Sequence, residues 1–181
     1  MAIIVVGGSG RGVGKTALVC GLIAALPEFA WTAVKITSHR HFGPEPVWEE
    51  TSAGQQSDTA RYLAAGAKRA LLLTAPGDDL TGPLSALRAA CPPGANLIFE
   101  SNRILELLKP DLCLMVEGQP DPNGPKPSFA QGLRHADALV RRSLLDRHIN
   151  ESRQPNPLFE LADLGQISAE LAAWVRSALR P

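Results

Sequence analysis

The sequence predicts an α/β fold in which a mostly parallel sheet is flanked by helices. Short apolar segments recur along the chain and alternate with longer segments of helical spacing. The short segments are apolar at nearly every position, as expected of strands buried on both faces of a parallel sheet. The first of them runs into a glycine-rich loop and then a helix, a common opening unit of such sheets. With 181 residues, the chain is expected to form a single domain, residues 1–181.

Strands and helices are expected to alternate along the chain. Apolar runs predict strands at residues 3–6, 31–36, 69–74, 96–100, 111–116 and 137–140, and residues 158–162 are the candidate for a last edge strand. Helical spacing, with serine caps at positions 57 and 168, predicts helices at residues 17–26, 58–65, 80–90, 103–108, 129–135 and 168–179. Proline, glycine and polar residues predict loops at residues 37–57 and 117–127. The first loop is long enough to be either functional or disordered.

The balance of charge argues against several classes of partner. Lysine and arginine number 18, as do aspartate and glutamate, so the formal net charge is zero. Without a basic excess, nucleic acid is not expected as a partner, and a ligand phosphate has to be held by local groups. No segment has the length expected of a membrane span, and no signal sequence is recognised. The 3 cysteines show no paired spacing and are expected to be packing residues in a reducing, cytoplasmic protein.

Residues 3–18 carry the clearest functional signal. A short strand is followed by the loop GGSGRGVG at 7–14, then by Lys15 and Thr16, after which the helical pattern begins. This order is typical of a phosphate-binding loop and predicts the fold of P-loop nucleoside triphosphate hydrolases. The usual spacing, GxxxxGK[ST], needs a glycine where Ser9 stands, so the loop is counted from Gly8 and has one additional residue.

The residue types in this loop match what phosphate binding needs. Glycines allow consecutive backbone N–H groups to turn toward phosphate oxygens, and the start of the helix adds the positive end of its dipole. Lys15 can reach the outer phosphates, the Thr16 hydroxyl can ligate Mg²⁺, and Arg11 is expected to contact phosphates or a neighbouring subunit. The predicted nucleotide-binding residues are Gly10, Arg11, Gly12, Val13, Gly14, Lys15, Thr16 and Ala17.

Acidic residues suited to a metal site lie at the ends of predicted elements. Glu100 ends an apolar strand, and the carboxyl edge of a parallel sheet is where such folds bind ligands. Glu117 ends the next strand in the same way and is the alternative for this role. Thr16, Asp58 and Glu100 are the predicted Mg²⁺ ligands. Asp58 begins a helix, so an N-cap or first-turn role would also explain it.

Lys15, Glu100 and Lys35 are the predicted catalytic residues. Lys35 ends the second strand, where it either faces a substrate anion across from the γ-phosphate or is a solvated charge. Together these residues would promote attack on the γ-phosphate by water or a substrate oxygen, through positioning and charge neutralisation. His39 and His41 lie two residues apart without companion cysteines, which is weak evidence for a metal site, and they are expected to contact the substrate or nothing.

Four segments, which cover most of residues 3–127, match one known pattern. They are IIVVGGSGRGVGKTALVCGLIAAL at 3–26, VKITSHRHF at 34–42, SDTARYLAAGA at 57–67, and DLCLMVEGQ followed by PKP at 111–127. Together they resemble the MobB-type proteins of molybdenum-cofactor guanine dinucleotide synthesis. The resemblance implies a nucleotide-binding accessory protein, a homodimer that hydrolyses GTP or ATP slowly beside a cofactor-biosynthesis partner.

The loop spacing instead resembles that of dethiobiotin synthetase. In that family a GT…VGKT loop, a strand-end lysine, an SD pair and a strand-end glutamate form the ATP–Mg²⁺ site, and Lys35, Asp58 and Glu100 stand at matching places. The family's glutamate precedes glycines, whereas Ser101 and Asn102 follow Glu100 here. The lysine of KGGxGKT ATPases is missing at position 10.

Three functions therefore stay open at this point. The first is the MobB-like accessory role, with Mg²⁺ and either ATP or GTP bound. The second is an ATP-dependent ligase or kinase that activates a carboxylate or carbamate near Lys35. The third is a non-catalytic switch that responds to nucleotide. A guanine-specific NKxD motif is absent, so the sequence does not choose between adenine and guanine.

Overall fold

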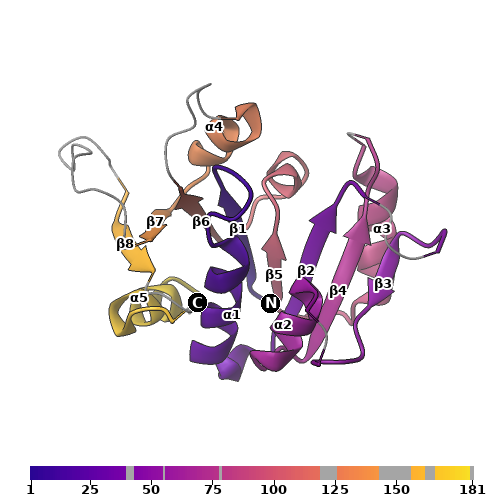
Figure 1. Ribbon diagram of the computed structural model, residues 1–181, viewed down its shortest axis with the longest axis horizontal. Coiled ribbons are helices and arrows are strands. Elements are labelled where there is room, and N and C mark those ends of the chain that lie inside the picture. The colour runs from indigo at the N-terminus through magenta and orange to yellow at the C-terminus, as the bar shows by residue number, and fades with distance from the viewer. Residues whose placement is uncertain are drawn as a thin grey trace.

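The computed structural model describes residues 1–39, 43–54, 56–77, 79–118, 126–142, 156–161 and 166–179. In this part of the chain the strands are β1 (Ile3–Gly8), β2 (Thr32–Thr37), β3 (Val47–Glu49), β4 (Arg69–Thr74), β5 (Leu97–Glu100), β6 (Leu112–Glu117), β7 (Ala138–Arg142) and β8 (Leu158–Leu161). They form one sheet in the order β3-β4-β2-β5-β1-β6-β7-β8 (Figure 1). All neighbouring strands are parallel except β3 and β4. The predicted mostly parallel sheet is confirmed.

Helices cover both faces of this sheet. They are α1 (Lys15–Ala25), α2 (Asp58–Ala64), α3 (Thr81–Ala90), α4 (Pro127–Leu133) and α5 (Ala169–Leu179), with short 3₁₀ turns η1 (Pro27–Phe29) and η2 (Arg103–Glu106). Figure 1 shows α1 and α2 in front of the sheet and α3 behind it. Within the described segments, none of these helices combines the length and apolarity that crossing a bilayer requires.

Alternate residues of the central strands divide the core into two layers. Ile4 and Val6 pack in a cluster with residues of α1, α2 and α5, whereas Val5 between them packs with residues of α3, η2 and α4. Because side chains alternate across a strand, each buried strand contributes to both layers. This explains why the strands are apolar at consecutive positions rather than at every second one.

Two sequence predictions need correction. The predicted loop at 37–57 contains β3, which pairs antiparallel with β4 through Val47 opposite Leu73. A strand of 3 residues is too short to show a periodic pattern, and its pairing with β4 decides its conformation. The helix predicted at 103–108 is instead the 3₁₀ turn η2 at Arg103–Glu106.

A buried carboxylate fastens the end of that segment to the start of α2. Glu50 is 6% exposed and accepts hydrogen bonds from the backbone N–H groups of Thr51 and Ser52 and from the hydroxyls of Ser57 and Thr59. Burial raises the pKa of Glu50, but these hydrogen bonds outweigh it and leave the pKa below its ordinary value. Ser57 is the N-cap of α2, as its sequence position predicts. The N-terminus of α2 is thereby held against the sheet.

Candidate functional site

The loop between β1 and α1 has the curled backbone that phosphate binding needs. Gly12 and Gly14 have φ values of 73° and 112°, in the left-handed region that favours glycine. Gly14 precedes α1, and within the described residues no side chain caps this helix and no acid lies in its first turn. Its first backbone N–H groups are therefore open to an anion. Lys15 donates a hydrogen bond from Nζ to the carbonyl oxygen of Gly10, which keeps its ammonium group within the loop.

Ser9, where the usual motif has glycine, ties the loop to the end of β6. Its backbone N–H donates to the carbonyl oxygen of Val116 at 3.0 Å, and its hydroxyl accepts from the N–H of Gly118 at 2.9 Å. A Cβ on Gly118 would lie 2.5 Å from Cγ1 of Val13, so the two chain segments approach as closely as glycine allows. The additional residue of the loop is thus accommodated against β6.

Asn102, which in the sequence is only a departure from a family pattern, holds the other side of the loop. Its Oδ1 accepts from the backbone N–H of Gly8 at 2.8 Å, and its Nδ2 donates to the carbonyl oxygen of Gly8 at 3.0 Å. The side-chain amide therefore pairs with the last residue of β1 as a neighbouring strand would. Because Asn102 follows β5, it links the phosphate loop to the strand that ends in Glu100.

Replacing Asn102 with leucine, which has a similar shape, is expected to lower the free energy of unfolding by about 1–3 kcal/mol, because the buried N–H of Gly8 loses its acceptor. Urea denaturation measures this loss. Asparagine also positions the loop, so phosphate-ligand affinity measured by calorimetry should fall in the same variant. The control is Arg134→Ser, a substitution at an exposed position far from the loop in sequence, and it should change neither quantity. Wild-type affinity in the leucine variant would contradict the positioning role.

The register of the sheet brings Lys35 and Glu100 together. They are paired residues on the adjacent parallel strands β2 and β5, so their side chains lie on the same face. Ala33 and Ile98, two residues earlier on each strand, belong to the core layer under α1, which identifies the face. Thr16, in the first turn of α1, donates from Oγ1 to Glu100 Oε2 at 2.8 Å. The phosphate loop and the strand-end acid are therefore in direct contact.

Glu100 is 3% exposed and accepts hydrogen bonds from three side chains. Thr16 and Tyr62 donate to its Oε2, and Lys35 donates to its Oε1. Tyr62 and Asp58 lie four residues apart on one face of α2. Asp58 Oδ2 lies 3.0 Å from Lys35 Nζ, so α2 supplies both a buried hydroxyl and a second carboxylate to the group.

The lysines of the site have opposite electrostatic surroundings. Burial lowers the pKa of Lys35, but Glu100 and Asp58 outweigh it and raise the pKa above 10.5. Burial also lowers the pKa of Lys15; Glu100 opposes this shift, whereas Lys35 and Lys126 reinforce it. Lys15 has no ion-pair partner among the described residues. Burial and the neighbouring lysines thus disfavour the positive charge of Lys15, and a bound phosphate would stabilise it.

This chain is similar to known proteins in structure. No protein-family model and no curated protein matches the sequence. A MobB protein homolog from Bacillus stearothermophilus has a TM-score of 0.52 and 16% sequence identity, with 99% of each chain covered. The "apo" form of LpxK from Aquifex aeolicus, in complex with ATP, has a TM-score of 0.55 and 21% identity, with 88% of this chain and 53% of that chain covered. This chain thus spans about half the length of LpxK.

The chain has a MobB-like P-loop fold. The similarity extends over the whole length of both chains, and it agrees with the resemblance found in the four sequence segments. At these identities it concerns the fold. The roles of individual residues follow from their geometry.

In this MobB-like fold, the two candidate acids at strand ends lie in different surroundings. Glu100 contacts Thr16, whereas Glu117 accepts a hydrogen bond from Arg141 Nε at 2.7 Å. Glu117 pairs with Arg141 in the register of β6 and β7, and it has the strand parity of Met115, which packs in the core layer away from α1. The geometry therefore favours Glu100 over Glu117 as the acid beside the phosphate loop.

The structure brings some of the other predicted site residues close to Glu100 and leaves others exposed. Asp58 joins the group through Lys35 and also lies 3.7 Å from Arg61. Arg11 is exposed at the tip of the loop. His39 is exposed, and its backbone N–H donates to the Thr37 hydroxyl at 3.1 Å. His41 lies outside the described residues, so its predicted role is not addressed by the structure.

The donor set fits Mg²⁺ better than a metal that needs a cage of protein ligands. Among the described residues, no three histidine, cysteine, aspartate or glutamate side chains are grouped to hold a metal. Thr16 and Glu100 do present adjacent oxygens at the start of α1. Mg²⁺ usually binds through one or two such groups, with waters and substrate phosphates completing its coordination. Thr16 and Glu100 are therefore the residues suited to it, and Asp58 stays a predicted ligand.

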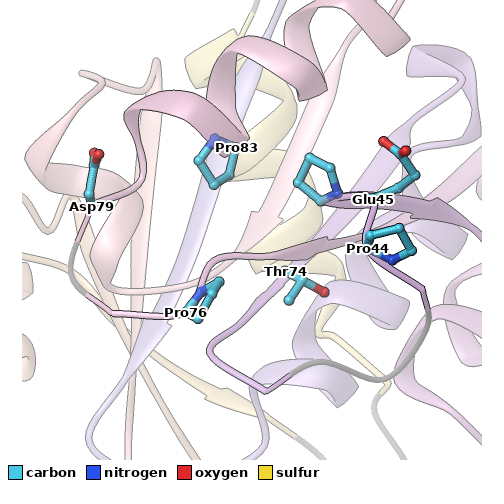
Figure 2. Close-up of a pocket in the computed structure, with 7 residues that line it drawn as sticks. Pro44, Glu45, Thr74, Pro76, Asp79 and Pro83 are labelled. Carbon is cyan, nitrogen blue, oxygen red and sulfur yellow. The ribbon is translucent and has the colours of Figure 1, made fainter.

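A pocket lies at the same edge of the sheet, beyond Lys35. Its volume is about 300 Å³, and its lining residues are Pro44, Glu45, Pro46, Thr74, Pro76, Asp79 and Pro83. They come from the segment before β3, the end of β4, the connection after it and the first turn of α3. Figure 2 shows Asp79 and Glu45 at opposite ends, with Thr74 between Pro76 and Pro44. The carboxyl edge of the sheet thus carries a pocket at the end of β4, which β2 and β5 separate from the phosphate loop.

Proposed function

We propose that this protein binds a nucleoside triphosphate with Mg²⁺ at residues 10–17 and hydrolyses it slowly, as a MobB-like accessory protein in molybdenum-cofactor biosynthesis. The observation that carries the proposal is the hydrogen bond between Thr16 and Glu100 beside an uncapped helix start. This arrangement brings together the three parts that a P-loop site needs, namely a helix end that can bind an anion, a hydroxyl for the metal and an acid for the metal. The ATP complex of LpxK supports a nucleotide as the ligand of this fold.

In the proposed reaction, the residues of the chain act by positioning and charge. The backbone N–H groups of the loop and the ammonium of Lys15 hold the β- and γ-phosphates, which neutralises charge as the γ-phosphoryl group leaves. Thr16 and Glu100 would hold Mg²⁺, which would supply positive charge that stabilises the phosphate oxygens. Lys35 then faces the γ-phosphate from β2. Water attacks phosphorus, the bond to the bridging oxygen breaks, and the products are the nucleoside diphosphate and phosphate.

A thermal-shift and calorimetric screen of ATP, GTP and CTP, each with and without Mg²⁺, tests the proposal. A specific ligand stabilises the native state by RT ln(1 + [L]/Kd), so the preferred triphosphate should raise the melting temperature more with Mg²⁺ than with EDTA. Inorganic phosphate at equal ionic strength is the control for general anion binding. If all three triphosphates behave like phosphate, the proposed nucleotide site is wrong.

A second candidate function is favoured by the pocket beyond Lys35. A ligase or kinase of the dethiobiotin synthetase type needs a place for its small-molecule substrate, and the pocket lies on the same edge of the sheet as the phosphate loop. Substrate-dependent release of diphosphate across a metabolite panel supports the enzyme, and stimulation only by a protein partner supports the accessory role. Tight binding without turnover in either assay supports a switch.

Residues 1–181 are proposed to form a single domain. The proposal that two copies form a homodimer rests on the family resemblance. Sedimentation of the free and nucleotide-bound protein measures its oligomeric state directly. A second copy that reaches the phosphate loop would contact the exposed Arg11 at the loop tip.

A further inference from the structure

Tyr62 is a member of the group around Glu100 that the proposed reaction does not use. It lies on α2, is fully buried, and belongs to the apolar cluster that also contains Leu18 and Ile98. Its hydroxyl donates a hydrogen bond to Glu100 Oε2. Because the side chain is inaccessible, it cannot contact a nucleotide, a metal ion or a substrate. Any effect of Tyr62 on the site must therefore pass through Glu100.

Packing alone does not require a hydroxyl at position 62. The side chain faces the core from α2, where a phenylalanine ring would fill the same space. A buried phenol needs a partner for its O–H group, and Glu100 supplies one because it projects from the same face of β5 as Ile98. What tyrosine adds over phenylalanine is therefore a contact with the acid at the end of the strand.

The donors to Glu100 determine how its carboxylate is turned. The last torsion of a glutamate side chain is soft, so packing by itself does not choose which oxygen faces which neighbour. Thr16 from α1 and Tyr62 from α2 both donate to Oε2, whereas Lys35 from β2 donates to Oε1. Oε2 is thus held between two neighbouring helices on one side of the sheet (Figure 1). Oε1 faces the ammonium group that also pairs with Asp58.

Tyr62 is the donor that can keep its place when a ligand binds. In the proposed reaction the Thr16 hydroxyl would ligate Mg²⁺ and Lys35 would face the γ-phosphate, so each of these donors acquires a second partner. Tyr62 is buried away from both ligands. Its hydrogen bond to Glu100 can therefore hold the carboxylate in one orientation throughout the reaction.

We infer that Tyr62 is a positioning residue that orients Glu100 for Mg²⁺ through its hydrogen bond to Oε2. The inference rests on the proposed nucleotide site, since it concerns how well that site binds Mg²⁺ together with a triphosphate. Without the hydroxyl, the carboxylate can turn about its last bond, and the metal site is no longer preorganised. Loss of a hydrogen bond to a metal-ligating group typically lowers metal affinity or activity by about 10–100-fold.

Replacing Tyr62 with phenylalanine tests this role, because the ring is kept and the hydroxyl is removed. The imido analogues of ATP and GTP, which resist hydrolysis, are titrated by calorimetry into the full-length protein with Mg²⁺ and with EDTA. The affinity measured with Mg²⁺ should fall by about tenfold in Tyr62→Phe, whereas the affinity measured with EDTA should stay the same. A purely structural role would change both affinities together or neither of them.

Thr59→Val is the matched control on the same helix. Thr59 is also buried, and its hydroxyl donates to a different carboxylate, Glu50 Oε2, at 3.2 Å. Ser57 donates to the same oxygen at 2.9 Å, so the start of α2 stays attached when the threonine hydroxyl is removed. Both variants should lose stability in urea denaturation, since each leaves a buried carboxylate with one donor fewer. Only Tyr62→Phe should lose affinity that depends on Mg²⁺.

A spectroscopic measurement tests the hydrogen bond itself and needs no nucleotide. The chain contains a single tyrosine, so ¹³C labelling of tyrosine at Cζ gives one resonance, which reports on the Tyr62 hydroxyl. This resonance should move in Glu100→Gln, because an amide oxygen is a weaker acceptor than a carboxylate. It should stay in place in Glu117→Gln, which changes the acid at the end of β6.

Three results would each overturn the inference: an unchanged Mg²⁺-dependent affinity in Tyr62→Phe, an equal loss in Thr59→Val, or a tyrosine resonance unaffected by Glu100→Gln. If the wild type binds an analogue with Mg²⁺ and one of these results is found, the role of Tyr62 fails alone. If the wild type binds neither analogue, the proposed nucleotide site is wrong, and the role of Tyr62 falls with it.

Discussion

Replacing Lys15 with alanine is expected to weaken triphosphate binding by about a hundredfold while the protein stays folded. Lys15 supplies the ammonium group of the loop, and the loss of two charge-assisted hydrogen bonds to phosphate corresponds to about 3 kcal/mol. The same substitution is not expected to destabilise the folded protein. Burial lowers the pKa of Lys15, which means that its charged form is less favourable in the folded protein than in the unfolded chain.

The pH dependence of this cost follows from linkage. Because the folded-state pKa of Lys15 is below 10.5, the cost of its charge is fully present below the folded-state pKa and is relieved as the pH rises from that pKa toward 10.5. The alanine variant lacks this cost, so its free energy of unfolding at neutral pH should be equal to or higher than that of the wild type. A bound phosphate raises the pKa of Lys15, so binding at alkaline pH should take up protons.

Calorimetry of the Mg²⁺–triphosphate complex measures the affinity, and titrations in buffers of different ionisation enthalpy measure the proton uptake. Urea denaturation gives the stability. Lys68→Ala removes an exposed lysine between α2 and β4 and is the matched control, with no expected change in affinity. Unchanged triphosphate affinity in the Lys15 variant would show that the loop is not the binding site.

Replacing Glu100 with glutamine is expected to lower Mg²⁺-dependent turnover by about a hundredfold or more, with a smaller loss of triphosphate affinity. Glutamine keeps the shape of the side chain and can still contact Thr16 and Tyr62. It removes the negative charge that Mg²⁺ needs and that Lys35 neutralises in the present structure. The Mg²⁺ concentration that gives half-maximal turnover should rise as well, which a purely structural role would not cause.

Glu117→Gln is the matched control for this prediction. Both glutamates end a strand adjacent to β1, but Glu117 pairs with Arg141 on the side of the sheet away from α1. Phosphate release is measured over a range of Mg²⁺ concentrations for both variants. If Glu117→Gln loses turnover and Glu100→Gln does not, the metal site has been assigned to the wrong strand.

The phosphate loop and most of the strands and helices could be predicted because their signals are local. A β-branched run, a glycine-rich loop and a helical pattern in residues 3–26 determine their own conformations through interactions between near neighbours. Ser57 could be predicted as a helix cap for the same reason. The strand β3 could not, because three residues carry no period and the pairing partner lies in β4.

The contacts that complete the site could not be predicted, because they join residues far apart in the chain. Tyr62 and Asn102 reach partners 38 and 94 residues away, respectively. In the sequence, Tyr62 is indistinguishable from an aromatic core residue of an amphipathic helix, and Asn102 from a polar loop residue. Lys126, whose charge acts on Lys15, is likewise an isolated basic residue among prolines.

The sequence by itself determined that this chain has a glycine-rich loop at the start of a helix, set in a mostly parallel sheet, because these features depend on local backbone preferences and apolar patterning. Only the tertiary structure decided which acid lies beside Thr16. Strand order places both Glu100 and Glu117 next to β1, and the two-residue period of a strand directs Glu100 toward α1 and Glu117 away from it. That register results from packing of the whole sheet, and no short segment of sequence contains it.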